Sequence, residues 1–335
     1  MLVFIAVPLV SVVVQSLHVP KHKVVATGEV CGPFGCTSQP LVKDTSKNAV
    51  KNEITSETAG ESTSVFGRFV GFEIYRDRAH LAIAEITTVW QQSDNLASFA
   101  THIMNLPFYR ALGFTLVYTL LVTPIALLCG FWLACRVAEI PRLIRSTVVF
   151  ITVLPLFVTP LVGSLLLFWM MDSSGIIGYA LQWLSGDPAL SIRASAPLTW
   201  IALIGYGIWH SVPLAFIVYY AGLHTVPRDA VDSARVDGAS RRQITRYVVA
   251  PHLATLTVFL LLILLMDNFR VLEPIIGFAS ESHANSLSYS IFTDLRGDAS
   301  RFNSAAATSV LTIAALALLL LPVLLQAARL QRAPR

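Results

Sequence analysis

Four polar side chains lie together at the end of a long apolar run, namely Asp267, Asn268, Arg270 and Glu273. The uncharged run before them, 253–266, is too short to cross about 30 Å of hydrocarbon as a helix. A helix that spans a membrane here must therefore carry these residues to some depth, with positions 267, 270 and 273 roughly on one face until Pro274 interrupts it. Ionisable residues inside a span usually face a cavity or a partner and mark a pathway. The alternative is an intrahelical ion pair that holds a kink or a subunit interface.

Two aromatic side chains in an earlier apolar run, Tyr206 and Trp209, are three residues apart and share a helix face. Flat rings of this kind can stack on the ring of a solute, and we group them with the four polar residues as a candidate solute pathway. The alternative is that they pack against neighbouring helices or lie in the interfacial belt, where Trp and Tyr gather.

The segment 226–252 connects two long apolar runs and is longer than a plain connector. Pro227 suits a first helical turn, and Gly238 breaks the helical pattern. Ser240 followed by Gln243 predicts a capping box at the start of a second helix. The pattern predicts two short helices joined by a glycine bend, which protrude as an elbow with a small apolar face for another protein.

The composition is that of a membrane protein. Of 335 residues, 55% are hydrophobic and 13% are charged, against about 25% charged residues in a soluble domain. The apolar residues form blocks of about 20 or more, the length of a membrane-spanning helix. An ordinary soluble enzyme and a β-barrel, whose strands alternate in polarity, are therefore excluded. A net charge of +4 without a basic tract argues against nucleic acid as a partner.

Six apolar blocks predict six transmembrane helices, at 1–17, 112–135, 147–171, 197–222, 253–278 and 304–327. Block 1–17 has neither a basic leader nor a small-residue cleavage site, so we expect a first span with a trimmed or misassigned start rather than a signal peptide. With a cytoplasmic N-terminus, the inner segments hold 11 of the Lys and Arg residues and the two short outer loops hold 3. The positive-inside rule therefore favours cytoplasmic N- and C-termini.

The first outer loop, 18–108, is the one sizeable extramembrane region, and its part 18–64 looks like an insertion rich in Ser, Thr and Lys. A core of five spans follows at 109–327, and a cytoplasmic tail at 328–335. Cys31 and Cys36 lie in CGPFGC, where Gly-Pro favours a turn. In an oxidising periplasm this predicts a disulfide-closed hairpin; a metal-binding thiol pair is the alternative, although no His or third Cys stands nearby.

Motifs of other function classes are missing from the sequence. Neither an HExxH motif of a membrane-embedded enzyme nor a Walker A sequence is present, so we expect neither catalysis nor ATP binding in this chain. A self-sufficient secondary transporter is the alternative for a membrane protein with an internal polar cluster. Such transporters usually show paired repeats or broken helices in both halves, whereas this sequence shows one interrupted helix and no repeat.

The elbow segment resembles the EAA coupling loop of ABC-importer permeases. In that loop a Glu-Ala-Ala, an Asp-Gly-Ala and a Pro recur at fixed spacing. The matching positions here are Asp232, Ser233 and Ala234, then Asp237, Gly238 and Ala239, then Pro251. Asp232 and Ser233 depart from the Glu and Ala of the pattern. Four further stretches resemble carbohydrate permeases of the maltose-transporter type, and their MalF-like subunit in particular: 69–77, 108–120, 175–186 and 300–311.

The resemblance implies an all-α polytopic membrane protein with the type I ABC-importer permease fold, and a transport subunit rather than an enzyme. It implies four kinds of partner: a second, MalG-like permease subunit, two ATP-binding subunits, a periplasmic solute-binding protein and membrane lipid. ATP and Mg are bound by the ATP-binding subunits, so no cofactor or metal is expected in this chain. The six elbow residues 232–234 and 237–239 are implied to face the ATPase.

The solute implied by the resemblance is a sugar, polyol or glycoside, which crosses the bacterial inner membrane by alternating access. An ABC permease for a non-sugar solute, such as an amino acid or an oxyanion, is the alternative. Arg270 also leaves an acidic sugar derivative open.

Overall fold

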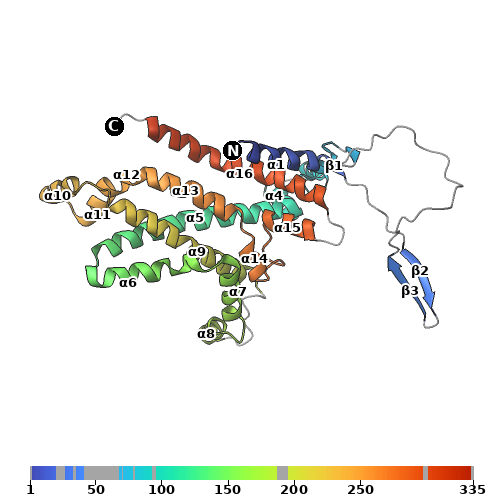
Figure 1. Cartoon of the computed structure of the whole chain (residues 1–335), viewed down its shortest axis with the longest axis horizontal. Coiled ribbons are helices and arrows are strands. Elements are labelled where there is room, and N and C mark those ends of the chain that lie inside the picture. Colours follow the sequence, from blue (N-terminus) through green and yellow to red (C-terminus); the bar gives the residue numbers. More distant parts are fainter. Residues whose placement is uncertain are drawn as a thin grey trace.

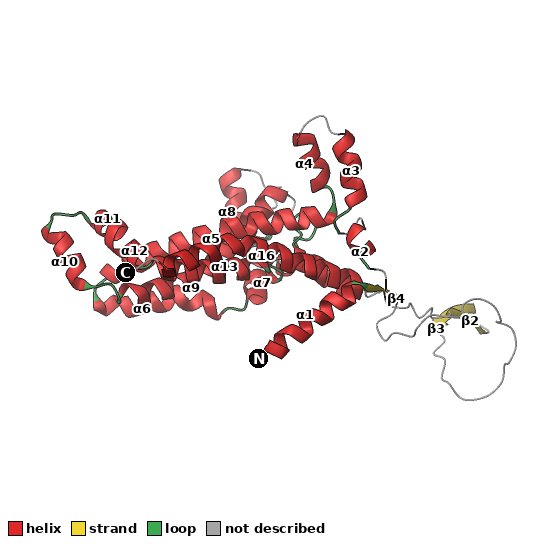
Figure 2. Cartoon of the chain, turned by 90° about the horizontal axis from the view of Figure 1, so that it is seen from above, coloured by secondary structure: helices red, strands yellow, loops and turns green. Residues whose placement is uncertain are grey.

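The computed structural model describes residues 2–19, 27–32, 35–40, 68–69, 71–77, 80–92, 96–186, 195–296 and 301–332. Most of the predicted insertion 18–64 lies outside these ranges, as do residues 333–335 of the predicted tail and the side chains of Cys31 and Cys36. The described part of the chain is dominated by helices, as predicted (Figure 2).

The N-terminal third contains short elements. They are α1 (Leu2–Ser16), β1 (His18–Val19), β2 (Thr27–Gly32), β3 (Gly35–Pro40), β4 (Arg68–Phe69), α2 (Glu73–Arg76), α3 (Ile83–Gln92) and α4 (Leu96–Met104). The helices that follow, up to the elbow, are α5 (Pro107–Glu139), α6 (Arg142–Val153), α7 (Pro160–Met171), α8 (Ile176–Ser185) and α9 (Ala196–Leu223).

The elbow consists of α10 (Arg228–Val236), α11 (Arg241–Ile244), a π-helical turn (Thr245–Val249) and α12 (Ala250–His252). The chain ends with α13 (Ala254–Phe269), α14 (Glu273–Gly277), α15 (Leu287–Arg296) and α16 (Phe302–Arg332).

Among the described residues, three helices are long and apolar enough to span a membrane: α5, α9 and, between Phe302 and Arg329, α16. The predicted blocks 112–135, 197–222 and 304–327 lie within them. Two bent helix pairs raise the number of spans to at most five if each pair counts as one. Helix α1 has 15 residues, about 22 Å at 1.5 Å per residue, which is shorter than the hydrocarbon core. The six-span arrangement therefore stays a prediction.

The predicted span 147–171 is not one straight helix. The helical segments Leu143–Phe157 and Pro160–Met171 meet at 97°, and α7 runs across the direction of α5 and α9 (Figure 1). Pro155 and Pro160 explain the break, because a proline inside a helix removes a hydrogen bond and its ring clashes with the preceding turn.

The predicted span 253–278 is also broken. Helix α13 ends at Phe269, five residues before the Pro274 that was expected to interrupt it. In a continuous helix the ring of Pro274 would clash with the carbonyl of Arg270, so the chain leaves the helix before that point. The Ser286 hydroxyl donates to the freed carbonyl of Val271 at 2.6 Å, which satisfies a buried backbone group.

The observed helix breaks correct two expectations. Asp267 belongs to α13, whereas Glu273 begins α14, so these residues do not share one helix face with Arg270. The sequence indicated one interrupted helix, and the structure has bends at both the α6–α7 and the α12–α13 junctions, the latter of 69°.

Helices α5, α9 and α13 pack side by side at the centre of the molecule (Figure 1). Their facing sides supply the largest buried apolar side chains, such as Phe216, Leu260 and Leu264. The elbow α10–α11 lies at one end of this bundle, and α14 and α15 lie toward the other end. Helices α1 and α16 pack against each other beside the bundle.

Strands β1 and β4 pair antiparallel, with His18 opposite Phe69, so both ends of the intervening segment meet at one place. Strands β2 and β3 form the predicted hairpin, with Cys31 opposite Cys36 in the register. Because the cysteine side chains are not described, the disulfide stays a prediction.

Candidate functional site

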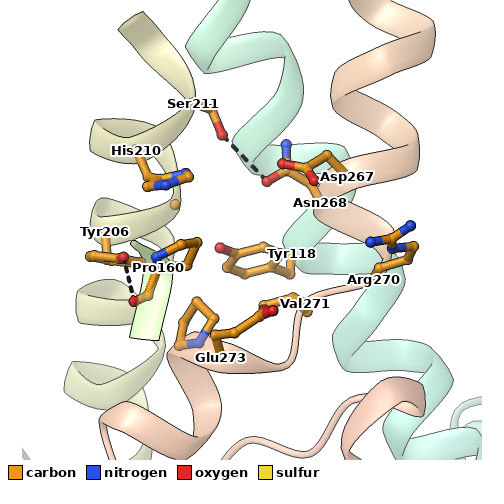
Figure 3. A pocket seen from close by; sticks show the side chains of 12 residues that line it. Tyr118, Pro160, Tyr206, His210, Ser211, Asp267, Asn268, Arg270, Val271 and Glu273 are labelled. Carbon is orange, nitrogen blue, oxygen red and sulfur yellow. Dashed lines mark hydrogen bonds between the residues drawn. The ribbon is translucent and has the colours of Figure 1, made fainter. Parts of the chain in front are cut away.

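A pocket of about 100 Å³ lies where both broken helices meet α5 and α9 (Figure 3). It is lined by residues of five segments: Tyr118 of α5, Pro160 of α7, Tyr206, Gly207, His210 and Ser211 of α9, Asp267 and Asn268 of α13, and Arg270, Val271, Glu273 and Pro274 at the α13–α14 break. Five of the six residues predicted for the solute pathway are thus brought together. The helix breaks place irregular backbone at a cavity, where a membrane protein tolerates it.

Tyrosine side chains form one wall of the pocket. The Tyr206 hydroxyl donates to the carbonyl of Pro160 at 2.7 Å, which ties α9 to the first turn of α7. Tyr118 lies between Tyr206 and the α13 residues (Figure 3). A Cβ atom on Gly207 would collide with the Tyr118 hydroxyl, so a glycine at this position allows α5 and α9 to approach. Both tyrosines are 3% exposed, and the wall is therefore fixed.

The charged side chains of the pocket are exposed in the single chain. Asp267, Arg270 and Glu273 are all accessible, and the structure gives none of them an ion pair within the described residues. The intrahelical ion pair considered from the sequence is therefore not formed. These charges are free to bind a polar solute or a partner subunit.

Asn268 has a different role from its charged neighbours. Its amide nitrogen donates to Thr123 Oγ1 of α5 at 3.2 Å, and its carbonyl accepts from Ser211 Oγ of α9 at 3.4 Å. The side chain is 6% exposed. Polar side chains that bond across helices stabilise packing inside a membrane, so Asn268 fastens three helices beside the pocket.

Trp209 does not line the pocket. Its ring centroid is 5.9 Å from that of Tyr206, but the side chain is 42% exposed on the outer side of α9. Residues three apart differ by about 60° around a helix, since each residue turns 100°. This difference separates the buried Tyr206 from the exposed Trp209.

Seven of the lining residues were not predicted for the solute pathway from the sequence: Tyr118, Pro160, Gly207, His210, Ser211, Val271 and Pro274. Tyr118 lies inside an apolar block, where an aromatic residue carries no signal of its own. Ser211 follows His210 in an otherwise apolar run, and this polar pair is a signal that could have been used.

The elbow has the predicted form. Helix α10 ends in a Schellman motif: Ala239 N–H donates to Ala234 O and Gly238 N–H to Arg235 O, both at 3.0 Å. Gly238 has φ +79°, a conformation that favours glycine. The backbone N–H of Ser240 donates to Gln243 Oε1 at 2.7 Å, which confirms the capping box.

The six resemblance-derived elbow residues all lie on α10 or its bend, and no residue of α10 is buried. Asp232 pairs with Arg235 at 3.1 Å on the surface. Arg241 pairs with Glu139 at 2.9 Å, which ties the base of the elbow to the end of α5. Val236 is 87% exposed at the tip, so the elbow presents an apolar side chain that nothing in the described chain covers.

The base of the elbow is fastened to the bundle. The Thr225 hydroxyl donates to Gly222 O at 2.8 Å, so it accepts a hydrogen bond from His252 Nε2 at 3.2 Å. Nearer the bundle, the Tyr219 hydroxyl of α9 donates to Thr257 Oγ1 of α13 at 3.1 Å. Two hydrogen bonds thus join the α9 side to the α12–α13 side near the elbow. In the described part of the chain no group of His, Cys, Asp and Glu side chains could hold a metal ion.

Long apolar helices around a polar pocket, with a fastened elbow at one end, define a membrane-embedded transport subunit. Residues 96–335 match the family described as the binding-protein-dependent transport system inner membrane component, and the chain belongs to this family.

Named relatives belong to the same class. The sn-glycerol-3-phosphate transport system permease protein UgpA of Agrobacterium fabrum is 26% identical over 234 residues, 67% of this chain and 77% of the relative. The probable ABC transporter permease protein y4oQ of Sinorhizobium fredii is 27% identical over 149 residues, 44% of this chain and 47% of the relative. The chain therefore spans about half the length of this second relative.

A solved structure shares the fold. A crystal structure of a bacterial ABC transporter involved in the import of the acidic polysaccharide alginate aligns with a TM-score of 0.61 and 23% identity. The alignment covers 74% of this chain and 88% of that chain. The two chains thus share their overall fold.

Proposed function

We propose that the chain is one permease subunit of an ATP-driven importer, which moves a carbohydrate-type solute from a periplasmic binding protein into the cytoplasm. The observation that carries the proposal is the elbow. No residue of α10 is buried, and the elbow is bent by a glycine with positive φ. At its base, Thr225 bonds to His252 and Arg241 pairs with Glu139 of α5. Such a connector is suited to pass the motion of a docked partner to the pocket.

The proposed cycle contains no covalent step in this chain. ATP and Mg bind to two ATP-binding subunits, which dock on the elbow residues 232–239. Closure of those subunits displaces the elbow, and the links Thr225–His252 and Tyr219–Thr257 transmit the displacement to α9 and α13. The pocket then opens alternately to the two sides of the membrane, a population shift driven by ATP.

A second, MalG-like permease subunit is needed in this proposal. Pockets that enclose a small ligand usually measure about 300–1,000 Å³, and the pocket of the single chain has about 100 Å³. The exposed side chains of Asp267, Arg270 and Glu273 are then completed by the second subunit to form a solute path.

The chemistry of the pocket supports a polyhydroxylated solute. Carboxylates, tyrosine hydroxyls and an arginine supply both acceptors and donors for hydroxyl groups. The names of the relatives refer to sn-glycerol-3-phosphate and to an acidic polysaccharide, and Arg270 offers a cation for an acidic group of a sugar or polyol derivative. A non-sugar solute is the alternative.

The proposal places the protein in the bacterial inner membrane, with six spans, α1 as the first, and both termini in the cytoplasm. The elbow and the C-terminal end of α16 lie toward the same end of the molecule (Figure 1), which supports one cytoplasmic face. Arginines gather at this end, and cytoplasmic loops are rich in Lys and Arg.

Reconstitution tests the proposal. The chain, co-purified with its partner subunits, is placed in liposomes with the binding protein, and uptake of labelled sugars, polyols and their acidic derivatives is measured with and without ATP. Uptake that requires both ATP and the binding protein is expected. Uptake that follows an ion gradient without ATP would favour a secondary transporter instead.

A further inference from the structure

An exposed apolar stripe follows one face of α5. Its members recur at steps of three or four residues and are 37–68% exposed: Val117, Leu121, Ile125, Leu128 and Trp132. The opposite face of α5 is buried against α9 and α13. From 117 to 132 the stripe is about 22 Å long at 1.5 Å per residue, which exceeds the depth of one leaflet of a bilayer with a 30 Å hydrocarbon core.

A cation ends this stripe. Arg136 lies one helical turn beyond Trp132, and its guanidinium carbon lies 5.6 Å from the centroid of the Trp132 ring. Trp132 is 58% exposed. Trp side chains prefer the boundary between hydrocarbon and headgroups, so the pair marks the depth at which lipid phosphates lie.

Arg136 has no acidic partner within the described residues. The nearest carboxylate along the helix, Glu139, pairs with Arg241 at 2.9 Å. Another arginine at this corner, Arg145, is used differently, because it donates to the carbonyls of Ala138 and Ile140 at 2.8 Å. The guanidinium of Arg136 therefore lies over the Trp132 ring and can bind an anion.

We propose that this end of α5 binds an anionic phospholipid, with its phosphate on Arg136 and its acyl chains along the stripe that ends at Trp132. The charge complements an anionic headgroup and the stripe complements acyl chains, so one lipid molecule satisfies both features. A free phosphate ion would use the arginine alone. The inference depends on the membrane location that the family provides, and it is independent of the solute and of ATP coupling.

Fluorescence of Trp132 tests the proposal. The chain, with whatever subunits co-purify with it, is placed in phosphatidylcholine nanodiscs that contain 10% of a lipid brominated on its acyl chains. The brominated lipid is either phosphatidylglycerol or phosphatidylcholine. Subtraction of the signal of Trp132→Phe from that of the parent isolates the emission of Trp132, and the same subtraction is made in each variant background.

The brominated anionic lipid is expected to quench Trp132 with about five-fold higher apparent affinity than the brominated zwitterionic lipid, since one interfacial arginine contributes about that factor. Arg136→Gln is expected to remove the preference while leaving quenching by the zwitterionic lipid intact. Arg329→Gln is the matched control, because it removes an exposed arginine from the C-terminal part of α16. This end of α16 points toward the same end of the molecule as the elbow (Figure 1). The control variant is expected to keep the preference.

Three results would overturn the proposal. Equal quenching by both lipids in the wild type would show that this face of α5 contacts lipid without preferring an anionic headgroup. An equal loss of preference in Arg329→Gln would indicate general surface charge rather than a site. Trp132 emission that neither lipid quenches would indicate that another protein subunit covers this side chain.

Discussion

Gly238 offers the sharpest test of the elbow, because the cost of replacing it comes from the backbone alone. A Cβ atom at this position would meet no atom within 4 Å, so a side chain causes no collision inside the chain. The expected cost in free energy comes from the φ of +79° at Gly238. A left-handed conformation costs an L-residue about 1–2 kcal/mol, less for Asn, which visits this region more readily.

The magnitude follows from these values. Gly238→Ala is expected to lower the ratio of bent to unbent elbow about five-fold, at about 1 kcal/mol, and Gly238→Val about thirty-fold, at about 2 kcal/mol. Gly238→Asn is expected to have the smallest effect. Membrane insertion is expected to be unchanged, because α10 contains no buried residue. Gly238→Asp adds a charge at the docking face and is expected to abolish transport.

The assay is ATP-dependent uptake by the reconstituted complex, with the amount of co-purified ATP-binding subunit measured in the same samples. The order of uptake is expected to be Gly, Asn, Ala, Val. Gly186 supplies a matched control: it has φ +71° and an equally open surrounding, but it follows α8, away from the elbow. Gly186→Ala and Gly186→Val are expected to transport normally. Equal uptake across the Gly238 series would refute the role of the bend.

Three further predictions concern the pocket. Arg270→Ala is expected to lower uptake more than recovery of the assembled complex, since its side chain lines the pocket without an ion pair; equal losses in both would indicate a structural role. Tyr206→Phe removes the hydrogen bond to Pro160 and is expected to lower the stability of the purified complex by about 1 kcal/mol, measured by thermal unfolding; an unchanged stability would contradict the tie between α9 and α7. Trp209→Phe is expected to leave the KM of uptake unchanged, because Trp209 lies outside the pocket; a raised KM would return this side chain to the solute path.

The elbow could be predicted from the sequence because its signals are local. A capping box needs residues three apart, and a helix that ends in a left-handed turn needs a glycine, so Ser240, Gln243 and Gly238 specify their own geometry. The three long helices were predicted for a similar reason, since uninterrupted apolar length is read directly from the chain.

The helix breaks were predicted less well because a proline reports that a helix must end but not where. Pro274 is within α14, and α13 ends at Phe269, since the carbonyl freed at Val271 finds a partner in Ser286, 15 residues away. Pro155 and Pro160 favour a break between α6 and α7, but the packing of α7 against α14 and the hydrogen bond from Tyr206 to Pro160 hold α7 in its bent position. Such contacts between distant segments leave no mark on local sequence.

The pocket was predicted in part. Asp267, Arg270 and Glu273 are conspicuous because charges are costly in an apolar block. Tyr118 carries no such signal, and Ser211 carries only the weaker signal of a polar pair with His210 in an apolar run. The packing of α5 against α9 brings both side chains to the site. Trp209 does not line the pocket although Tyr206 does. A spacing of three still leaves a rotation of about 60°, which separates the buried from the exposed side of a helix.

The most direct test of the central claim is to purify the tagged wild-type chain in mild detergent from its native membranes and to identify the proteins that accompany it by mass. Recovery of a second permease subunit together with an ATP-binding subunit is predicted. A chain that is reproducibly recovered alone, in a detergent that retains another complex of this kind, would contradict the account.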